Sequence, residues 1–168
     1  MILEEQLIHP FATRIIWVYS EWQPDYYMIR ERYPNIEFEN RWRDHIFDSL
    51  TPEQRNILVL DDQMAVASSS KSVADFFTKG SHHRNLTVIY LVQNVYNQGN
   101  SLRTILLNSN YNVVFRNGRN TSQYRTMAYQ ICPRDGQWLV EAFTDATSEP
   151  YGYLVLDHPH RHPKTRQS

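Results

Sequence analysis

One stretch decides the fold of this chain: residues 56–64, which read Asn-Ile-Leu-Val-Leu-Asp-Asp-Gln-Met. Residues 57–60 form an unbroken apolar run that is too short for a helix and contains the β-branched Val59, so it predicts a strand. Apolar residues fall on both faces of that strand. We therefore expect both faces to be covered, as in the parallel sheet of an α/β fold.

Two acids, Asp61 and Asp62, follow this strand directly. Ligands of open α/β sheets bind at the carboxyl ends of the strands, and paired carboxylates there suit a Mg²⁺ ion, with the second acid left to orient a nucleophile. A turn or a helix cap explains two aspartates equally well, because Asp is favoured in both. The stretch alone leaves these alternatives open.

The rest of the chain alternates between predicted strands and predicted helices, which indicates a mainly parallel sheet. We expect strands at 14–20, 35–39, 57–60, 86–92, 112–115 and 153–156, and helices at 26–33, 42–50, 72–79, 102–107, 122–132 and 138–143. Residues 64–72 are small and Ser-rich and predict a connector. We find no repeat and no domain boundary, so 1–168 is predicted to be a single domain with loosely ordered segments at 1–13 and 158–168.

Composition indicates a globular protein, with 41% hydrophobic and 21% charged residues among 168. The single cysteine, Cys132, excludes an internal disulfide framework and fits a reducing compartment. No signal peptide or transmembrane segment is visible, so we expect an intracellular location, in nucleus or cytoplasm, with no membrane partner. The net charge of −1 combines an acidic segment up to Asp62 with a basic remainder, which suits either nucleic acid or an ordinary solvated surface.

Several other residues are candidates for binding. Gln93 follows the predicted strand at 86–92 and marks a second switch from apolar to polar sequence. Arg116 and Arg119 flank a Gly turn after another strand and predict either a phosphate grip or a solvated loop. The histidines at 82, 83, 158, 160 and 162 have neither a cysteine partner nor helical spacing, so we favour polar surface over a zinc site.

Three groups of motifs give the chain a recognisable pattern. They are residues 77–85 (Phe-Thr-Lys-Gly-Ser-His-His-Arg-Asn), then Val88–Asn94, Gly99 and Arg103-Thr104; Asp145-Ala146-Thr147 with Pro150-Tyr151-Gly152-Tyr153; and, upstream, Trp17, Glu21-Trp22-Gln23-Pro24 and Pro34-Asn35-Ile36. With these motifs nearly the whole chain after residue 13 resembles the viral DNA-packaging ATPases of the HerA–FtsK type. The versions in Maverick/Polinton and adintovirus-like elements, related to the poxvirus-type packaging ATPase, look most similar.

The resemblance implies a three-layer P-loop NTPase domain of the RecA-like type that uses ATP and Mg²⁺ to move double-stranded DNA into a capsid. Asp61 would hold Mg²⁺ and Asp62, where the wider branch usually has Glu, would polarise the attacking water. Gln93 would sense the γ-phosphate, and Arg84, Arg103 or Arg116 would act as the arginine finger. Arg119, His82 and His83 would contact phosphate or DNA. The implied partners are a homo-oligomeric ring, DNA and capsid proteins.

One motif of that family is missing from the sequence. A P-loop reads Gly-x-x-x-x-Gly-Lys-Ser/Thr, but the five glycines stand at 80, 99, 118, 136 and 152, and none precedes the strand at 57–60. Residues 70–72, Ser-Lys-Ser, imitate its end without glycines and on the wrong side of the acids. We therefore expect a domain that lacks the first strand, P-loop and first helix and does not bind Mg-ATP productively. The alternatives are a non-catalytic or domesticated domain that binds protein or DNA, and a truncated gene model.

Overall fold

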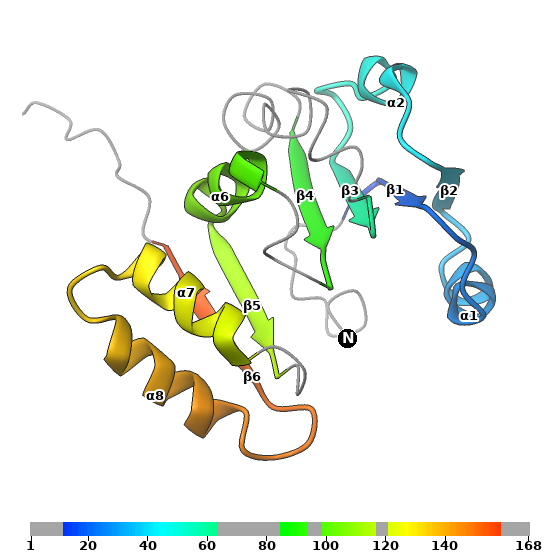
Figure 1. The fold of residues 1–168 in the computed structure, drawn as a ribbon. Coiled ribbons are helices and arrows are strands. Elements are labelled where there is room, and N and C mark those ends of the chain that lie inside the picture. The colour runs from blue at the N-terminus through cyan, green and yellow to red at the C-terminus, as the bar shows by residue number, and fades with distance from the viewer. Residues whose placement is uncertain (1–11, 64–84, 94–98, 117–120, 159–168) are drawn as a thin grey trace, which may run out of the picture. The chain divides into compact units, whose positions relative to one another are not determined.

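The computed structural model describes residues 12–63, 85–93, 99–116 and 121–158 (Figure 1). The chain divides into two compact units, Met1–Ile105 and Leu106–Ser168, and each has its own sheet. The expectation that 1–168 forms a single domain stays a prediction. None of the helices in the described ranges combines the length and the apolar character needed to cross a bilayer.

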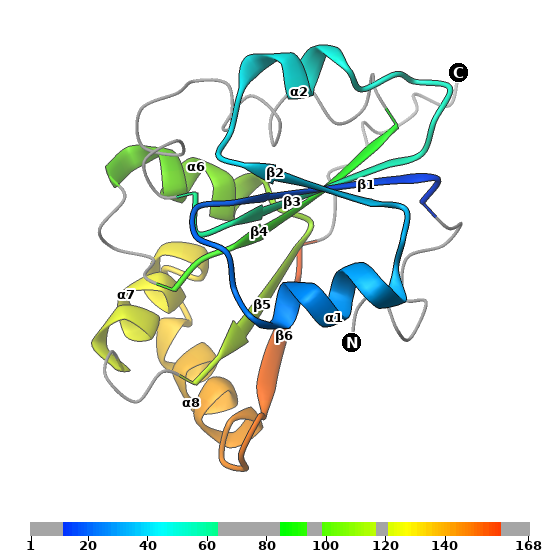
Figure 2. The ribbon, with the colours of Figure 1, turned by 90° about the vertical axis from the view of Figure 1, so that its right-hand side faces the viewer.

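The first unit contains a four-stranded, wholly parallel sheet with the order β2-β1-β3-β4. The strands are β1 (Arg14–Tyr19), β2 (Ile36–Asn40), β3 (Asn56–Asp61) and β4 (Leu86–Leu91). Figure 2 shows helix α1 (Asp25–Arg32) and the short helix α2 (Asp44–Asp48) on opposite faces of this sheet. The predicted α/β class and parallel sheet are confirmed for this unit, whereas the predicted connector at 64–72 and helix at 72–79 lie outside the described residues.

β3 is buried on both faces, as its apolar run predicts. Ile57 and Val59 point to one face, where they pack in a cluster with Ile15 and Ile36. Leu58 and Leu60 point to the other face and are fully buried. Because successive side chains of a strand alternate between faces, this burial needs cover on both sides of the sheet.

The sequence also explains the limits of α1. Pro24 stands immediately before the helix, where its fixed φ angle is compatible with helix and its missing N–H costs nothing. Asp25 lies in the first turn and Arg30 in the last, so both charges complement the helix dipole. The helix ends at Arg32, two residues before Pro34, because the residue preceding a proline is disfavoured in helical conformation.

The second unit contains an antiparallel pair of strands, β5 (Tyr111–Phe115) and β6 (Tyr153–Asp157). Two helices, α7 (Thr121–Ile131) and α8 (Gly136–Ala146), separate these strands in sequence. The parallel arrangement expected for strands separated by helices does not extend to this pair. A hairpin of two helices brings the chain back in the opposite direction, whereas a single crossover helix would keep the strands parallel.

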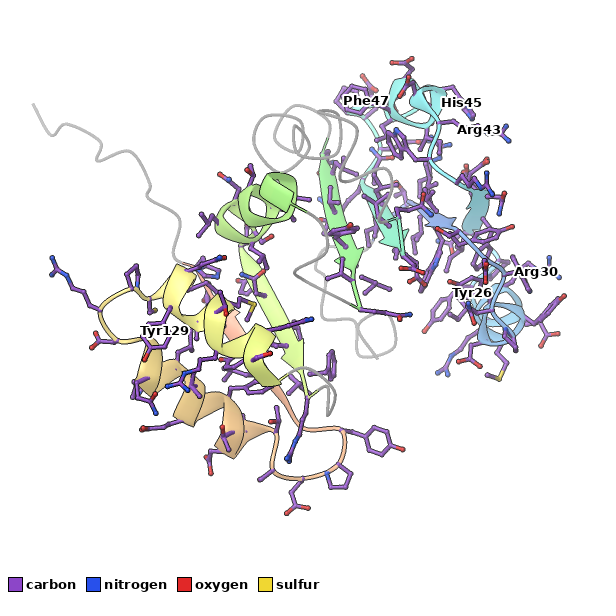
Figure 3. All side chains as sticks on the ribbon, viewed as in Figure 1. Tyr26, Arg30, Arg43, His45, Phe47 and Tyr129 are labelled. Carbon is purple, nitrogen blue, oxygen red and sulfur yellow. The ribbon has the colours of Figure 1, made fainter. Side chains whose placement is uncertain are left out.

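The core of the second unit lies between these helices and the inner face of the two strands. Its buried members are Tyr124, Met127, Ala128, Leu139 and Phe143, and Val114, Leu154 and Leu156 pack against them. The rings of Tyr124 and Phe143 stack with centroids 3.6 Å apart. Gly136 lies beneath the ring of Tyr129, which is labelled in Figure 3, and a Cβ at that glycine would come within 2.4 Å of the ring. The contact between α7 and α8 therefore depends on a glycine at this point.

Among the described residues one further helix, α6 (Gly99–Asn108), follows β4 in the sequence and includes the boundary between the two units. The predicted helix at 102–107 corresponds to its central part. Ile105 is buried, and the backbone carbonyl of Leu106 accepts a hydrogen bond from Asn112 Nδ2 at 3.2 Å. The end of α6 is thereby tied to the start of β5.

Candidate site at the carboxyl edge of the parallel sheet

The predicted acids lie at the carboxyl edge of the four-stranded sheet. Asp61 is the last residue of β3, and its register partner on β4 is Leu91. Gln93 follows two residues later and is exposed, and the backbone N–H of Asp62 donates to the carbonyl of Leu91 at 3.4 Å. Since β3 and β4 are parallel neighbours, Asp61, Asp62 and Gln93 share one edge of the sheet. Their predicted positions are therefore found, while their catalytic roles stay predictions.

The carboxylate of Asp61 is held by a tyrosine from α1. The hydroxyl of Tyr26, labelled in Figure 3, donates a hydrogen bond of 2.6 Å to Asp61 Oδ2. Burial, followed by the hydrogen bond to Asp61 and the charge of that carboxylate, raises the pKa of Tyr26 well above its ordinary value. Tyr26 therefore remains a protonated donor at neutral pH, and the bond fixes one oxygen of Asp61.

Asp62 adopts a left-handed backbone conformation, with φ of 51°. Asp and Asn tolerate this region better than other non-glycine residues because their short polar side chains bond locally. The turn interpretation of the second acid is therefore supported by the backbone. The negative charge of Asp62 also raises the pKa of Tyr26, by less than burial and Asp61 do.

Gln63 is buried and connects several segments at this edge by hydrogen bonds, although the sequence did not single it out. Its Nε2 donates to Ser20 Oγ at 3.0 Å and to the carbonyl of Asp61 at 3.3 Å, and its Oε1 accepts from the backbone N–H of Trp42 at 3.2 Å. Ser20 Oγ in turn donates to the carbonyl of Asp62 at 2.8 Å. One amide thus joins the ends of β1 and β3 to the segment before α2. In the sequence, only the position of Gln63 directly after Asp61 and Asp62 pointed to a role at this edge.

An aromatic cluster packs around Tyr26 at this edge of the sheet. Its members are Trp17, Tyr19, Trp22, Tyr26 and Phe38, whose ring centroids lie 5.3–6.4 Å from their neighbours. On the outer side, the guanidinium carbon of Arg30 lies 5.6 Å from the ring centroids of both Trp22 and Tyr27. The rings of these residues pack against one another, so the cluster has a packing role.

The other end of the sheet is closed by an ion pair. Arg14 Nε and Nη2 donate to the two carboxylate oxygens of Glu37 at 2.8 and 2.7 Å, and Nη1 donates to the carbonyl of Ser49 at 2.8 Å. The hydrogen bond from Arg14 lowers the pKa of Glu37. This bidentate geometry satisfies both charges within the protein, so the pair ties β1 to β2 and to the end of α2.

The remaining predicted binding residues either belong to the second unit or have side chains outside the described residues. Arg116 belongs to the second unit, where its Nη1 lies 3.4 Å from the carbonyl of Thr147. Arg103 lies in α6, and its side chain is outside the described residues. Arg84, Arg119, His82 and His83 also lie outside them. Their roles stay predictions.

A divalent cation at this edge would have few protein ligands. Among the side chains that the structure describes, no group of three or more His, Cys, Asp or Glu residues converges. The carboxylate of Asp61 has about four acceptor positions, and Tyr26 uses one of them. This donor set fits Mg²⁺, which is commonly bound through one or two carboxylates with water and phosphate completing the octahedron. It does not fit zinc, which prefers three or four nitrogen and sulfur ligands.

Comparisons of the chain with protein-family models, with curated proteins and with solved structures found no match.

Proposed function

We propose that the chain is part of an ATPase domain of the HerA–FtsK DNA-packaging type and that it carries the acidic half of a Mg²⁺-nucleotide site. The observation that supports this proposal is the common edge of β3 and β4, where Asp61 and Asp62 lie one strand away from Gln93. In parallel α/β sheets such an edge is the usual place for a ligand. The sequence resemblance supplies the choice of family.

In this proposal each residue at the edge has a separate task. Asp61, oriented by Tyr26, would hold Mg²⁺, and Asp62 would polarise the water that attacks the γ-phosphate. Gln93, which follows the neighbouring strand β4, would sense the γ-phosphate. When bound, Mg²⁺ would neutralise charge on the phosphates. The partners would be further copies in a ring and double-stranded DNA.

The same proposal predicts that the chain hydrolyses ATP negligibly. Phosphate binding in this class depends on backbone N–H groups that only a glycine-rich loop can present. The five glycines of the chain do not form that pattern before β3. The acids could then hold a metal ion without aligning a nucleotide for attack.

A non-catalytic binding domain is the second candidate, and one observation favours it. The 2.6 Å bond from Tyr26 makes the Asp61 carboxylate an acceptor within a largely aromatic setting. A carboxylate in that position can stabilise the sheet edge with no metal at all. In this case the chain would bind a protein or DNA partner through other surfaces.

Metal binding separates the two candidates, and turnover tests the predicted inactivity. We expect Mn²⁺, used as a paramagnetic substitute for Mg²⁺, to bind the wild-type chain weakly and to lose at least about tenfold in affinity in Asp61→Asn. Asp48→Asn is the matched control, because Asp48 is an exposed acid at the end of α2. ATP hydrolysis, measured with Mg²⁺ and duplex DNA, should stay at background in all three proteins.

Each other outcome has a defined meaning. Equal Mn²⁺ binding by wild type and Asp61→Asn would reject the acidic half-site and leave the binding domain as the better candidate. Mg²⁺-dependent turnover that disappears in Asp61→Ala would reject the predicted inactivity and establish a working ATPase. Circular dichroism of each variant checks that the sheet remains folded.

A further inference from the structure

Three neighbouring strand ends of the parallel sheet are joined by one side chain, the amide of Gln63, which is only 2% exposed. The sheet order places β1 between β2 and β3. The hydrogen bonds of the amide reach Asp61 at the end of β3, Ser20 directly after β1 and Trp42 two residues after β2. Because adjacent strands lie about 4.8 Å apart, these bonds cross roughly 10 Å of the carboxyl edge.

The partners of Gln63 fix the orientation of its amide. The backbone N–H of Trp42 can only donate, so it must face Oε1. The backbone carbonyl of Asp61 can only accept, so it must face Nε2. A glutamate of the same shape could keep the bond from Trp42, but its carboxylate could not donate to Asp61. The position therefore requires one donor and one acceptor, which glutamine supplies.

The turn at Asp62 is supported by the side chains of Ser20 and Gln63. Its left-handed φ of 51° lies in a region that residues other than glycine adopt infrequently. The backbone N–H of Asp62 reaches the carbonyl of Leu91 only at 3.4 Å, which is long for a hydrogen bond. Its carbonyl accepts from Ser20 Oγ at 2.8 Å, and that Oγ accepts in turn from Gln63 Nε2 at 3.0 Å. The support of the turn therefore leads back to Gln63.

We propose that Gln63 is the positioning residue of the acid pair: its amide holds the backbone of Asp61 directly and the turn at Asp62 through Ser20. Its part in metal binding rests on the proposed Mg²⁺ half-site, whereas its part in holding the turn does not. Gln63 itself would not contact the ion. Acids that are already held in place need not be ordered by the ion, and the loss of such outer contacts typically lowers metal affinity about 10–100-fold.

Amide hydrogen exchange of the full chain, followed for each residue by NMR, tests the support of the turn. The reporter is the backbone N–H of Asp62, because it bonds to Leu91 and not to Gln63. In Gln63→Met, which keeps the length of the side chain without its amide, we expect the protection of this N–H to fall at least about tenfold, because the turn opens locally. The N–H of Leu58, in the middle of β3, should keep its protection. Gln54→Met is the matched control, since Gln54 is exposed in the segment before β3.

A second variant, Gln63→Glu, separates the two ends of the amide. At neutral pH its carboxylate can still accept from the backbone N–H of Trp42, but it has no N–H to donate to the carbonyl of Asp61. We therefore expect the N–H of Trp42 to keep its protection in Gln63→Glu and to lose it in Gln63→Met. The N–H of Asp62 should lose protection in both variants.

Mn²⁺ binding then tests whether the held turn matters for the metal. Gln63→Met should bind Mn²⁺ at least about tenfold more weakly than wild type, and Gln54→Met should bind it equally well. Wild-type Mn²⁺ affinity in Gln63→Met overturns the proposal.

The exchange data contradict the proposal in two further cases. An Asp62 N–H that keeps its protection in Gln63→Met would show that the turn holds itself. A loss of protection that includes Leu58 would show that Gln63 supports the whole sheet rather than the acids. If wild type and Asp61→Asn bind Mn²⁺ equally, the proposed half-site fails, and the protection of Asp62 alone decides whether Gln63 holds the turn.

Discussion

The two sheets of this protein use apolar strands in opposite ways. In the four-stranded parallel sheet, β3 places Ile57 and Val59 on one face and Leu58 and Leu60 on the other, and all four are buried. In the two-stranded antiparallel sheet, β5 and β6 are almost as apolar, yet only the face against α7 and α8 is covered. Apolar sequence on both faces of a strand therefore predicts a demand for cover, which the first unit meets on both faces of β3 and the second unit meets on one face of β5 and β6.

The largest expected effect tests the burial of the parallel sheet. Leu58→Ala should lower the free energy of unfolding by about 2–5 kcal/mol, because it removes a fully buried side chain and leaves a cavity. Val155→Ala, at a half-exposed position of β6, should cost no more than about 0.5 kcal/mol. Urea denaturation at low protein concentration measures both. Similar losses for the two variants would mean that the sheets do not differ in burial as described.

The next effect concerns the tyrosine of the first unit. Tyr26→Phe should lower stability by about 1–3 kcal/mol, since it removes a bond to a charged, half-buried acceptor. Tyr27→Phe, on the exposed neighbouring position of α1, should change stability by less than about 0.5 kcal/mol. Chemical denaturation at neutral pH compares the two. If Tyr26→Phe proved neutral, Asp61 would not depend on the phenol, and the structural account of that acid would fail.

The smallest effect concerns Tyr124 in the second unit, whose hydroxyl donates to the carbonyl of Leu139 at 3.0 Å. Tyr124→Phe should cost about 0.5–1.5 kcal/mol at neutral pH, because the acceptor is uncharged. Burial raises the pKa of Tyr124 from 10.0 to about 12, so the folded state favours the neutral phenol. Its contribution is complete below about pH 10 and is lost as pH rises through about 12.

Thermal melts across that alkaline range provide the measurement. Wild type should lose stability faster than Tyr124→Phe above about pH 10, since the variant has no proton to release at this position. Parallel curves for the two proteins would show that Tyr124 titrates alike in the folded and unfolded chains.

The sequence predicted the parallel sheet better than the remainder of the fold. The apolar run of β3, the prolines at 24 and 34 around α1 and the alternation of elements are local signals, and each corresponds to an observed boundary within one or two residues. The partner of β5 was not predictable in the same way. Strand pairing across two helices depends on how the helices pack, and no local pattern in 111–115 or 153–157 encodes that direction.

The site was predictable only in outline. The polarity switches after β3 and β4 predicted that Asp61, Asp62 and Gln93 lie at one edge, and the parallel register brings them there. The contact between Tyr26 and Asp61 joins residues 35 positions apart, and Gln63 reaches Ser20 over 43 positions. Such contacts follow from tertiary packing, and residue type alone does not reveal them.

The left-handed turn at Asp62 has a consequence for how this edge can change over time. Asparagine and glycine adopt the same backbone angles at little or no cost, so either could replace the acid without disturbing β3. Asp61 has no such freedom while Tyr26 depends on its oxygen. The fold therefore tolerates replacement of the second acid, whereas replacement of the first removes the acceptor of the Tyr26 hydroxyl.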